Sequence, residues 1–273
     1  MDIFKGKATI VTGGASGIGR ALCEELGRRG AKVVLADVDI EGANEVVSAI
    51  RDHGGRAEAA EVDVTRSEEV QDLVDRIAVE HGHLDYMFNN AGIGIAADAR
   101  DLSLDQWRHV IAVNLLGVLY GTTAAYSVMT RQGFGHIVNM SSLGGLVGFP
   151  TAAPYSTAKH GVVGLSTSLR IEAAELGVKV SVACPGYVDT RFYDSATVLN
   201  ADREKLFATM PFKLMPAERA ARTVLRGVAR NRAVIVFPFH ARLIWRLHRL
   251  CPALLVSLGR KIVRDFRASR TEP

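Results

Sequence analysis

The stretch ATIVTGGASGIG, residues 8–19, joins a short apolar run to a glycine-rich turn, and a segment of helical period follows it. Glycines in such a turn let backbone N–H groups approach a pyrophosphate, which lies at the positive N-terminal end of the helix. The turn has the required strand before it and the required helix after it. We therefore predict a dinucleotide-binding unit, whose cofactor-binding residues are Gly13, Ser16, Gly17, Ile18 and Gly19.

Along the rest of the chain, short apolar runs rich in β-branched residues alternate with helical patterns. The expected strands span residues 8–11, 32–36, 58–62, 84–88, 136–140, 178–183 and 233–237. The expected helices span residues 19–29, 41–52, 67–81, 104–130, 155–176 and 217–230. Buried strands that alternate with helices form a parallel sheet covered on both faces. We predict an α/β fold with one doubly wound Rossmann-type domain over residues 1–238.

Ligands in such folds bind at the carboxyl ends of the strands, and Asp37 ends the second expected strand. A carboxylate at this position accepts hydrogen bonds from both ribose hydroxyls of an adenosine and repels a 2′-phosphate. No Arg or Lys lies within the glycine turn or directly after Asp37. NAD is therefore favoured over NADP. The alternative is that Asp37 only caps a helix or forms a turn.

Two further strand ends carry polar groups that suit the same cleft. Asp63, with Val64, closes the third strand and could accept a hydrogen bond from an adenine amino group. Asp63 could equally cap the helix expected at 67–81. The fourth strand ends in NNAG, residues 89–92, where Asn90, Ala91 and Gly92 suit a close backbone approach to a ribose. Together these strand ends predict one binding edge.

Tyr155 and Lys159 are spaced i, i+4 in the expected helix at 155–176, which places a phenol and an ammonium on one face. A neighbouring cation stabilises a phenolate and lowers the pKa of the tyrosine. Such a tyrosine could exchange protons with a substrate. By itself the pair also fits a packed ring beside a solvated charge.

The chain resembles the short-chain dehydrogenase/reductase family over nearly all of residues 5–237. The resemblance rests on the glycine turn at 12–19, the NNAG motif at 89–92 and the Tyr155-x-x-x-Lys159 motif. Ser142, thirteen residues before Tyr155, matches the catalytic serine of the family, and Asn114 matches its catalytic asparagine. The Pro-Gly turn of the family is matched by residues 185–190.

The resemblance implies a hydride transfer between a nicotinamide and an alcohol or ketone carbon. Tyr155 would be the general acid/base, and Lys159 would hold the nicotinamide ribose and lower the tyrosine pKa. Ser142 would donate a hydrogen bond to the substrate oxygen, and Asn114 would position Lys159. Ser141 could compete with Ser142 for this role by its position in the sequence. Adjacent strand residues face opposite ways, however, and the family spacing selects Ser142. The turn that follows the sixth strand would contact the cofactor through Pro185, Val188 and Thr190.

Composition and charge indicate a globular cytoplasmic protein. Hydrophobic residues make up 48% of the chain, no signal peptide precedes the first strand, and no uninterrupted apolar run is long enough to span a membrane. The three cysteines are far apart and lack metal-ligand spacing, so we expect no metal site. Eight of the 33 basic residues and two of the 29 acidic residues lie from Phe237 onward. The body is therefore slightly acidic, which argues against nucleic-acid binding.

Residues 239–273 extend beyond the usual family pattern and are expected to form a basic helical extension. An apolar stripe with interleaved arginines runs through residues 240–267, and Pro252 divides it into two helices. The stripe consists of Leu243, Leu247, Leu250, Leu254, Leu258, Ile262 and Phe266. We favour packing of this stripe on the enzyme or a sister subunit, where it covers the substrate pocket. The alternative is peripheral contact with an anionic membrane.

The substrate is expected to be apolar, sterol-like or lipid-like, because apolar residues surround the expected pocket. These residues are Leu143, Leu146, Val147, Phe149, Tyr187 and Phe192.

The irregular segment 190–215 is either a mobile substrate loop or an ordinary surface excursion. By resemblance, we expect a homo-oligomer, dimer or tetramer, formed through the helices at 104–130 and 155–176. Alternative functions are an NADP-dependent carbonyl reductase and a non-catalytic dinucleotide-binding scaffold.

Overall fold

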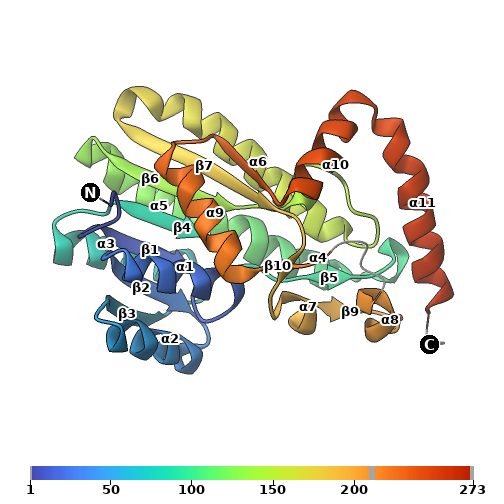
Figure 1. Ribbon diagram of the computed structural model, residues 1–273, viewed down its shortest axis with the longest axis horizontal. Coiled ribbons are helices and arrows are strands. Elements are labelled where there is room, and N and C mark those ends of the chain that lie inside the picture. Colours follow the sequence, from blue (N-terminus) through green and yellow to red (C-terminus); the bar gives the residue numbers. More distant parts are fainter. Residues whose placement is uncertain (1, 209–212, 271–273) are drawn as a thin grey trace.

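A seven-stranded parallel sheet forms the centre of the protein (Figure 1), in the strand order β11-β7-β6-β4-β1-β2-β3. The computed structural model describes residues 2–208 and 213–270, without the side chains of residues 207, 208 and 254. The strands are β1 (Ala8–Thr12), β2 (Lys32–Asp37), β3 (Arg56–Glu61), β4 (Tyr86–Asn89), β6 (Gly135–Met140), β7 (Val178–Pro185) and β11 (Val234–Phe237). The predicted fold class is confirmed, and the order reverses between β1 and β4, where doubly wound sheets bind ligands.

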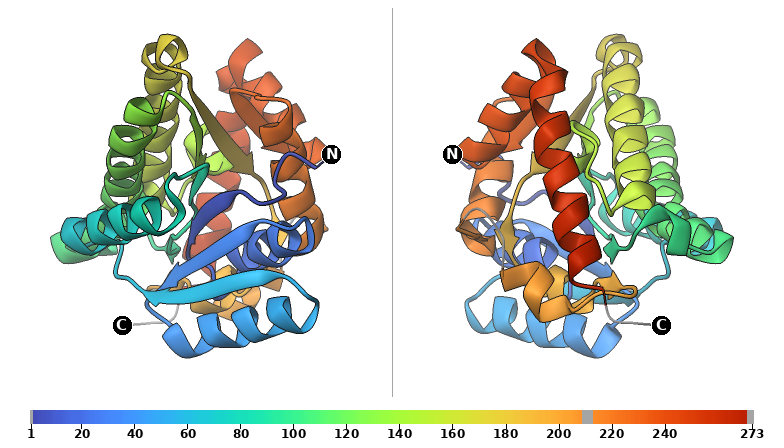
Figure 2. Two further views of the ribbon diagram at one scale, coloured as in Figure 1. Left: turned by 90° about the vertical axis from the view of Figure 1, so that its left-hand side faces the viewer. Right: turned by 90° about the vertical axis from the view of Figure 1, so that its right-hand side faces the viewer.

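Helices cover both faces of the sheet (Figure 2). One layer comprises α1 (Gly17–Arg28), α2 (Ile40–Asp52) and α9 (Ala217–Ala229), which share one buried apolar cluster. The other comprises α3 (Ser67–His81), α5 (Gly117–Gln132) and α6 (Ala153–Glu172). β1 is buried at every position, because helices pack on both sides of it, and three of its five residues are apolar.

One long helix runs from Leu104 to Gln132 and consists of α4 (Leu104–Ile111), a π-helical turn, η2 (Ala112–Leu116), and α5. Its length and hydropathy would allow it to cross a membrane. Its buried residues, however, pack against α3 and β6, so its apolar character is that of a core helix. The sequence predicted this helix but not its π-helical turn.

The segment 190–215 is more regular than we predicted. It contains α7 (Phe192–Ser195), β9 (Thr197–Val198) and α8 (Arg203–Ala208), while residues 209–212 lie outside the described chain. β9 pairs with β5 (Ile95–Ala96), and β8 (Val188–Asp189) pairs with β10 (Met215–Pro216). Arg203 ties this segment together by donating to the carbonyl oxygens of three residues between 193 and 196.

The C-terminal extension forms two helices, α10 (Phe239–Leu250) and α11 (Pro252–Ala268). Pro252 begins the second helix, where its missing N–H leaves no helical bond unmade. Phe266 is buried, and Arg267 forms an ion pair with Asp98 at 2.8 Å. The end of α11 is therefore attached to the enzyme body, which agrees with the favoured prediction that the extension packs on the enzyme. Leu254 has its side chain outside the described part.

Candidate active site

A cavity of about 1800 Å³ lies at the carboxyl ends of the strands. All of the predicted site residues except Gly19 line it, together with residues of the 190–215 segment and of both C-terminal helices. Its volume exceeds the several hundred Å³ that hold a typical small ligand. The cavity is therefore large enough for a dinucleotide with a substrate beside it.

The glycine turn has the backbone geometry of an anion-binding site. Gly13 and Gly17 have φ angles of +67° and +54°, which favour glycine. Ser16 is the N-cap of α1, but its side chain makes no capping hydrogen bond, and the first turn holds no acidic residue. The N–H groups of that turn remain available for a phosphate. Gly19 faces the turn instead of the cavity, since a Cβ there would overlap the carbonyl oxygen of Gly13.

Replacing Gly19 with alanine should therefore weaken dinucleotide binding and destabilise the fold. The added methyl group must displace the Gly13 carbonyl, and overpacking of this kind costs about 1–3 kcal/mol. We expect a lower melting temperature and at least a tenfold higher dissociation constant for NAD, measured by calorimetry. Gly164→Ala in α6 is the matched control, because its Cβ would meet no heavy atom within 4 Å. Equal behaviour of the two variants would contradict the packing role of Gly19.

Thr12 connects the glycine turn to the NNAG motif and was not among the predicted site residues. Its hydroxyl oxygen accepts hydrogen bonds from the N–H groups of Asn90 at 3.0 Å and Ala91 at 3.1 Å. The amide of Asn90 donates in return to the carbonyl oxygens of Thr12 and Gly13. These bonds fix the ends of β1 and β4 to each other. The position of Thr12, directly before the glycines, was the only signal in the sequence.

Asp37 and Asp63 both line the cavity, and neither caps the helix that follows it. Asp37 accepts hydrogen bonds from the N–H groups of Ala15 at 2.9 Å and Asp39 at 3.1 Å, so it holds the glycine turn against β2. The N-cap of α2 is Asp39. Asp63 accepts from the N–H and hydroxyl groups of Thr65. The N-cap of α3 is Arg66, so the helix-cap alternative is wrong for both carboxylates.

A buried network of polar side chains, also absent from the predictions, supports the binding edge. Asn89 donates to Asn139 at 2.8 Å, Thr122 donates to the same oxygen at 3.1 Å, and Asn139 donates to Ser166 at 3.0 Å. The four residues come from β4, α5, β6 and α6. Hydrogen bonds of this kind hold buried side chains rigidly, although Oδ1 of Asn89 has no hydrogen-bond partner in the described part of the chain. The network fixes the strand end that carries Ser142 relative to the helix that carries Tyr155.

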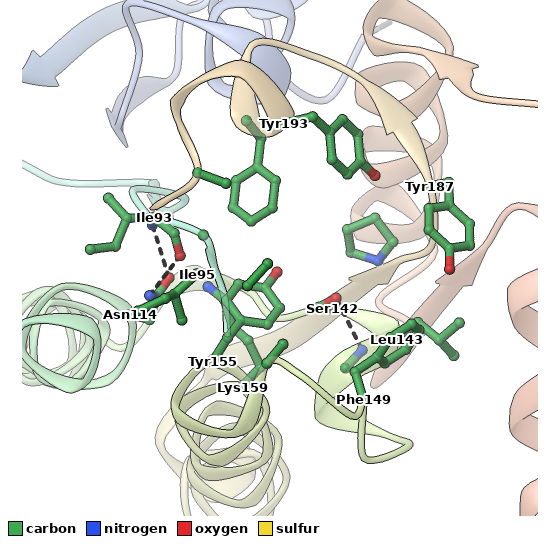
Figure 3. A pocket seen from close by; sticks show the side chains of 18 of the residues that line it. Ile93, Ile95, Asn114, Ser142, Leu143, Phe149, Tyr155, Lys159, Tyr187 and Tyr193 are labelled. Atoms are coloured by element: carbon green, nitrogen blue, oxygen red, sulfur yellow. Dashed lines mark hydrogen bonds between the residues drawn. The ribbon is translucent and has the colours of Figure 1, made fainter. Parts of the chain in front are cut away.

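Tyr155, Ser142 and Lys159 converge at the centre of the cavity (Figure 3). A Cβ added to Gly144 would lie 3.3 Å from a ring carbon of Tyr155 and 3.5 Å from the hydroxyl oxygen of Ser142, so these two side chains are neighbours. Lys159 is 3% exposed and donates to the carbonyl oxygen of Met140 at 3.0 Å. Ser141 also lines the cavity, but its hydroxyl donates to the carbonyl oxygen of Lys159.

Asn114 lies in the π-helical turn and is fully buried. Its amide nitrogen donates to the carbonyl oxygens of Ile93 at 3.0 Å and Val110 at 3.1 Å, and its oxygen accepts from the N–H group of Ile93. A Cβ on Gly92 would lie 2.7 Å from the oxygen of Asn114 and 3.3 Å from Nζ of Lys159. Asn114 and Lys159 therefore flank the same glycine. A π turn inside an α-helix is frequent at functional sites.

The pKa values of the pair differ from the sequence-based expectation. Burial raises the pKa of Tyr155 to about 12, against the lowering effect of a hydrogen bond with Ser142. Burial also lowers the pKa of Lys159 to about 8. The predicted lowering of the tyrosine pKa by Lys159 is not found, because the cost of desolvating a phenolate outweighs the favourable neighbours. The ammonium lies 5.7 Å from the centre of the Tyr155 ring.

The turn after β7 lines the cavity next to the glycine turn. A Cβ on Gly17 would lie 3.2 Å from the Cβ of Thr190, so the two turns touch. Val188 is buried, and Pro185 lines the cavity beside it. The Pro-Gly turn thus lies beside the glycine turn, on the wall of the same cavity.

Apolar side chains line the part of the cavity beyond Tyr155. Of the predicted pocket residues, Leu146 does not line it but packs in the core. The others do: Leu143, Val147, Phe149, Tyr187 and Phe192. The ring of Phe192 lies 5.7 Å from that of Tyr155. The extension adds a further apolar wall, formed by Leu243, Ile244, Leu247, Leu255, Leu258 and Ile262.

Comparison with known proteins identifies the family. A sequence profile described as short chain dehydrogenase matches residues 7–198. The chain belongs to the short-chain dehydrogenase family. This short-chain dehydrogenase is therefore an oxidoreductase, and the predicted family resemblance is confirmed.

Three relatives illustrate the similarity. The chain is 34% identical over 255 residues to the putative oxidoreductase SadH of Mycobacterium tuberculosis, with 92% of each protein covered. It is 43% identical over 190 residues to cis-4-hydroxycyclohexanecarboxylate dehydrogenase of Sinomonas cyclohexanicum, covering 69% of this chain and 76% of the relative. A short-chain dehydrogenase/reductase from Burkholderia phymatum, solved in complex with NAD, has a TM-score of 0.84 at 30% identity. That comparison covers 93% of this chain and 97% of the solved one.

Proposed function

We propose that this short-chain dehydrogenase interconverts an apolar secondary alcohol and its ketone with NAD as cofactor. The observation that carries the proposal is that the side chains of Tyr155 and Ser142 are neighbours in the cavity and that the buried ammonium of Lys159 lies 5.7 Å from the centre of the Tyr155 ring. They lie between the glycine turn and an apolar chamber. The relative from Sinomonas cyclohexanicum, by its name, acts on a ring with a secondary alcohol.

The chain's own residues would hold the substrate and move one proton. In reduction, Oη of Tyr155, which its raised pKa keeps protonated, would give its proton to the carbonyl oxygen, and in oxidation the phenolate form would take the hydroxyl proton of the alcohol. Ser142 donates a hydrogen bond to the same substrate oxygen and stabilises the charge that develops there. A bound nicotinamide would supply the hydride acceptor for oxidation of the carbinol carbon and the hydride donor for reduction of the ketone.

The cofactor would be held by the edge that the strand ends form. The N–H groups of the first turn of α1 suit the pyrophosphate, and Asp37 would accept hydrogen bonds from the adenosine ribose. Asp63 and Val64 suit the adenine, while Asn90 and Lys159 suit the second ribose. Asn114 would position Lys159 through Gly92, which both residues flank.

A screen of secondary alcohols tests the proposal, with NAD and NADP assayed in parallel by absorbance of the reduced nicotinamide. Cyclic alcohols, sterols and long-chain hydroxy compounds form the panel, because the chamber beyond Tyr155 is apolar and large. Reduction of NAD by at least one of them is the expected result. Binding of NAD without turnover of any compound would favour the non-catalytic scaffold.

The preference for NAD should depend on the negative charge of Asp37. Asp37→Asn keeps an oxygen that can accept from Ala15 but removes the charge that repels a 2′-phosphate. We expect the ratio of kcat/KM values for NAD and NADP to fall about tenfold or more, since like-charge contacts cost several kcal/mol. Asp39→Asn is the control, because Asp39 caps α2 and does not line the cavity. An unchanged ratio in Asp37→Asn would refute this role.

We also propose that the enzyme is cytoplasmic and homo-oligomeric, a dimer or tetramer. Exposed apolar residues on the two long helices support an interface there, among them Leu119 in α5 and Ile171 in α6. Light scattering of the purified protein measures the oligomeric state, and a monomer would contradict the proposal.

A further inference from the structure

The turn between α10 and α11 projects from the body (Figure 1). Apolar side chains around this turn are exposed to solvent. We call residues 246–260 the hairpin tip. Leu250 is 84% exposed and Val256 is 51% exposed, and the residues at 251–253 between the helices are exposed as well. Exposed large apolar groups that cluster in this way mark an interaction surface.

Basic side chains flank this apolar tip. Arg246, Arg249 and Arg260 are exposed, and the sequence between 246 and 260 contains no acidic residue. None of the three arginines forms an ion pair with any residue in the described part of the chain. Arg249 lies over the ring of Trp245, with 5.5 Å between its guanidinium carbon and the ring centre. The tip thus combines apolar groups with uncompensated positive charge.

The tip is continuous with the substrate chamber. Leu247, Leu255 and Leu258 belong to the tip and also line the cavity. Leu247 and Leu258 are 38% and 53% exposed, so the apolar lining continues from the cavity to the outer surface. A molecule held by the tip would lie beside the mouth of the chamber.

We propose that the hairpin tip docks on an anionic phospholipid bilayer and places the mouth of the chamber against the lipid. An amphipathic element with arginines beside its apolar groups binds the interface of such a bilayer, where each basic residue gains about 1 kcal/mol. A second copy of the chain fits less well. The arginines of two tips would face each other across a symmetric interface and repel.

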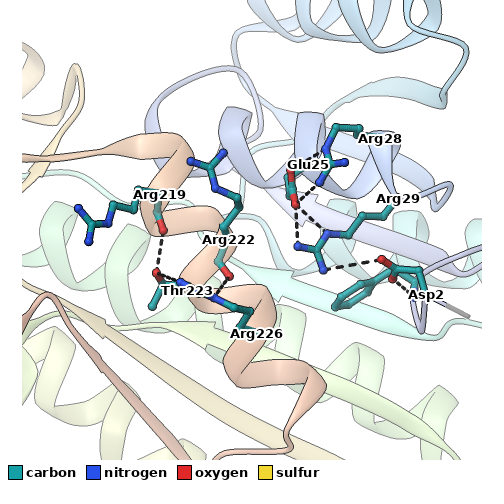
Figure 4. Close-up of polar contacts among 9 residues, drawn as sticks. Asp2, Glu25, Arg28, Arg29, Arg219, Arg222, Thr223 and Arg226 are labelled. Carbon is teal, nitrogen blue, oxygen red and sulfur yellow. Dashed lines mark hydrogen bonds and ion pairs between the residues drawn. The ribbon is translucent and has the colours of Figure 1, made fainter.

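The exposed face of α9 provides an internal comparison (Figure 4). It carries Arg219, Arg222 and Arg226, but no large apolar side chain of this helix is exposed. If positive charge alone bound the protein to lipid, α9 would contribute as much as the tip. If the apolar tip is required, variants of α9 should bind like the unchanged protein.

Flotation of the full-length protein with vesicles tests the proposal. One set of vesicles is phosphatidylcholine alone, and the other is phosphatidylcholine mixed with phosphatidylglycerol. Two double variants change the tip: Leu250→Ser/Val256→Ser removes exposed apolar groups, and Arg246→Gln/Arg260→Gln removes charge. The control is the α9 double variant Arg219→Gln/Arg222→Gln. We expect binding only to the anionic vesicles. The partition coefficient should fall at least tenfold in both tip variants and change less than twofold in the control.

A probe on Cys251 provides a second measurement. Cys23 and Cys184 are buried, whereas Cys251 is exposed within the tip, so a thiol-reactive, environment-sensitive dye should label it selectively. Its emission should shift to the blue when anionic vesicles are added, and light scattering without vesicles should show one oligomeric state for all variants. The proposal would be overturned if the unchanged protein did not float, or if the α9 control lost as much vesicle binding as the tip variants. It would also be overturned if the oligomeric state changed in the tip variants. Because flotation requires no turnover, its outcome is independent of the proposed reaction.

Discussion

Tyr155→Phe should lower kcat for alcohol oxidation by about three orders of magnitude and leave the dissociation constant for NAD within twofold of its original value. The substitution removes only the hydroxyl that would take the substrate proton. The ring would keep its packing beside Phe192 and its place above Lys159. Steady-state kinetics with the best alcohol of the screen, and calorimetry with NAD, measure the two quantities separately.

Tyr126→Phe is the matched control for this experiment. Tyr126 lies on α5 and packs against the core without lining the cavity, so removal of its hydroxyl should change kcat by less than twofold. A Tyr155→Phe enzyme with normal turnover would remove Tyr155 from the mechanism. If Tyr155→Phe lost as much affinity for NAD as it lost in kcat, the hydroxyl would serve cofactor binding instead of proton transfer.

Much of the fold could be predicted from the sequence because local and global signals agree. Short runs rich in apolar and β-branched residues, such as β1, are each followed by a segment of helical period, which is the pattern of a covered parallel sheet. The strand ends could be located to within two or three residues. Because ligands in this fold bind at strand ends, this precision was sufficient to predict that Asp37, Asn90 and Ser142 lie at one site. All three residues line the cavity.

Other features depend on contacts that no local pattern reveals. The π-helical turn at Asn114 has the same apolar periodicity as the helix around it. Asn139 has the sequence pattern of an ordinary strand residue, although it joins the buried network that includes Asn89 and Ser166. The pKa of Tyr155 could not be predicted because it depends on how completely the assembled cavity removes water from the phenol.

Lys159→Met should abolish activity and at the same time stabilise the protein. Burial lowers the pKa of Lys159 from 10.5 to about 8, so the folded state binds its proton less tightly than the unfolded state. Below pH 8 this costs about 3 kcal/mol of folding free energy. Methionine removes the charge but leaves the carbonyl oxygen of Met140 without its donor, which costs about 1–3 kcal/mol. We expect a net gain of about 1 kcal/mol at pH 7.

The pH dependence of that gain distinguishes desolvation from better packing. A lowered pKa destabilises the folded state fully below pH 8, and the effect disappears as the pH rises towards 10.5. Urea unfolding at several pH values should therefore show the advantage of Lys159→Met declining across this window and reversing at its upper end. Lys179→Met is the control, because Lys179 is exposed on β7 and should give no such slope. If the difference in free energy of unfolding between Lys159→Met and the unchanged protein stayed constant with pH, Lys159 would not be a desolvated lysine. Combined with loss of turnover, the expected slope would mean that the protein maintains a destabilising buried cation because its reaction requires one.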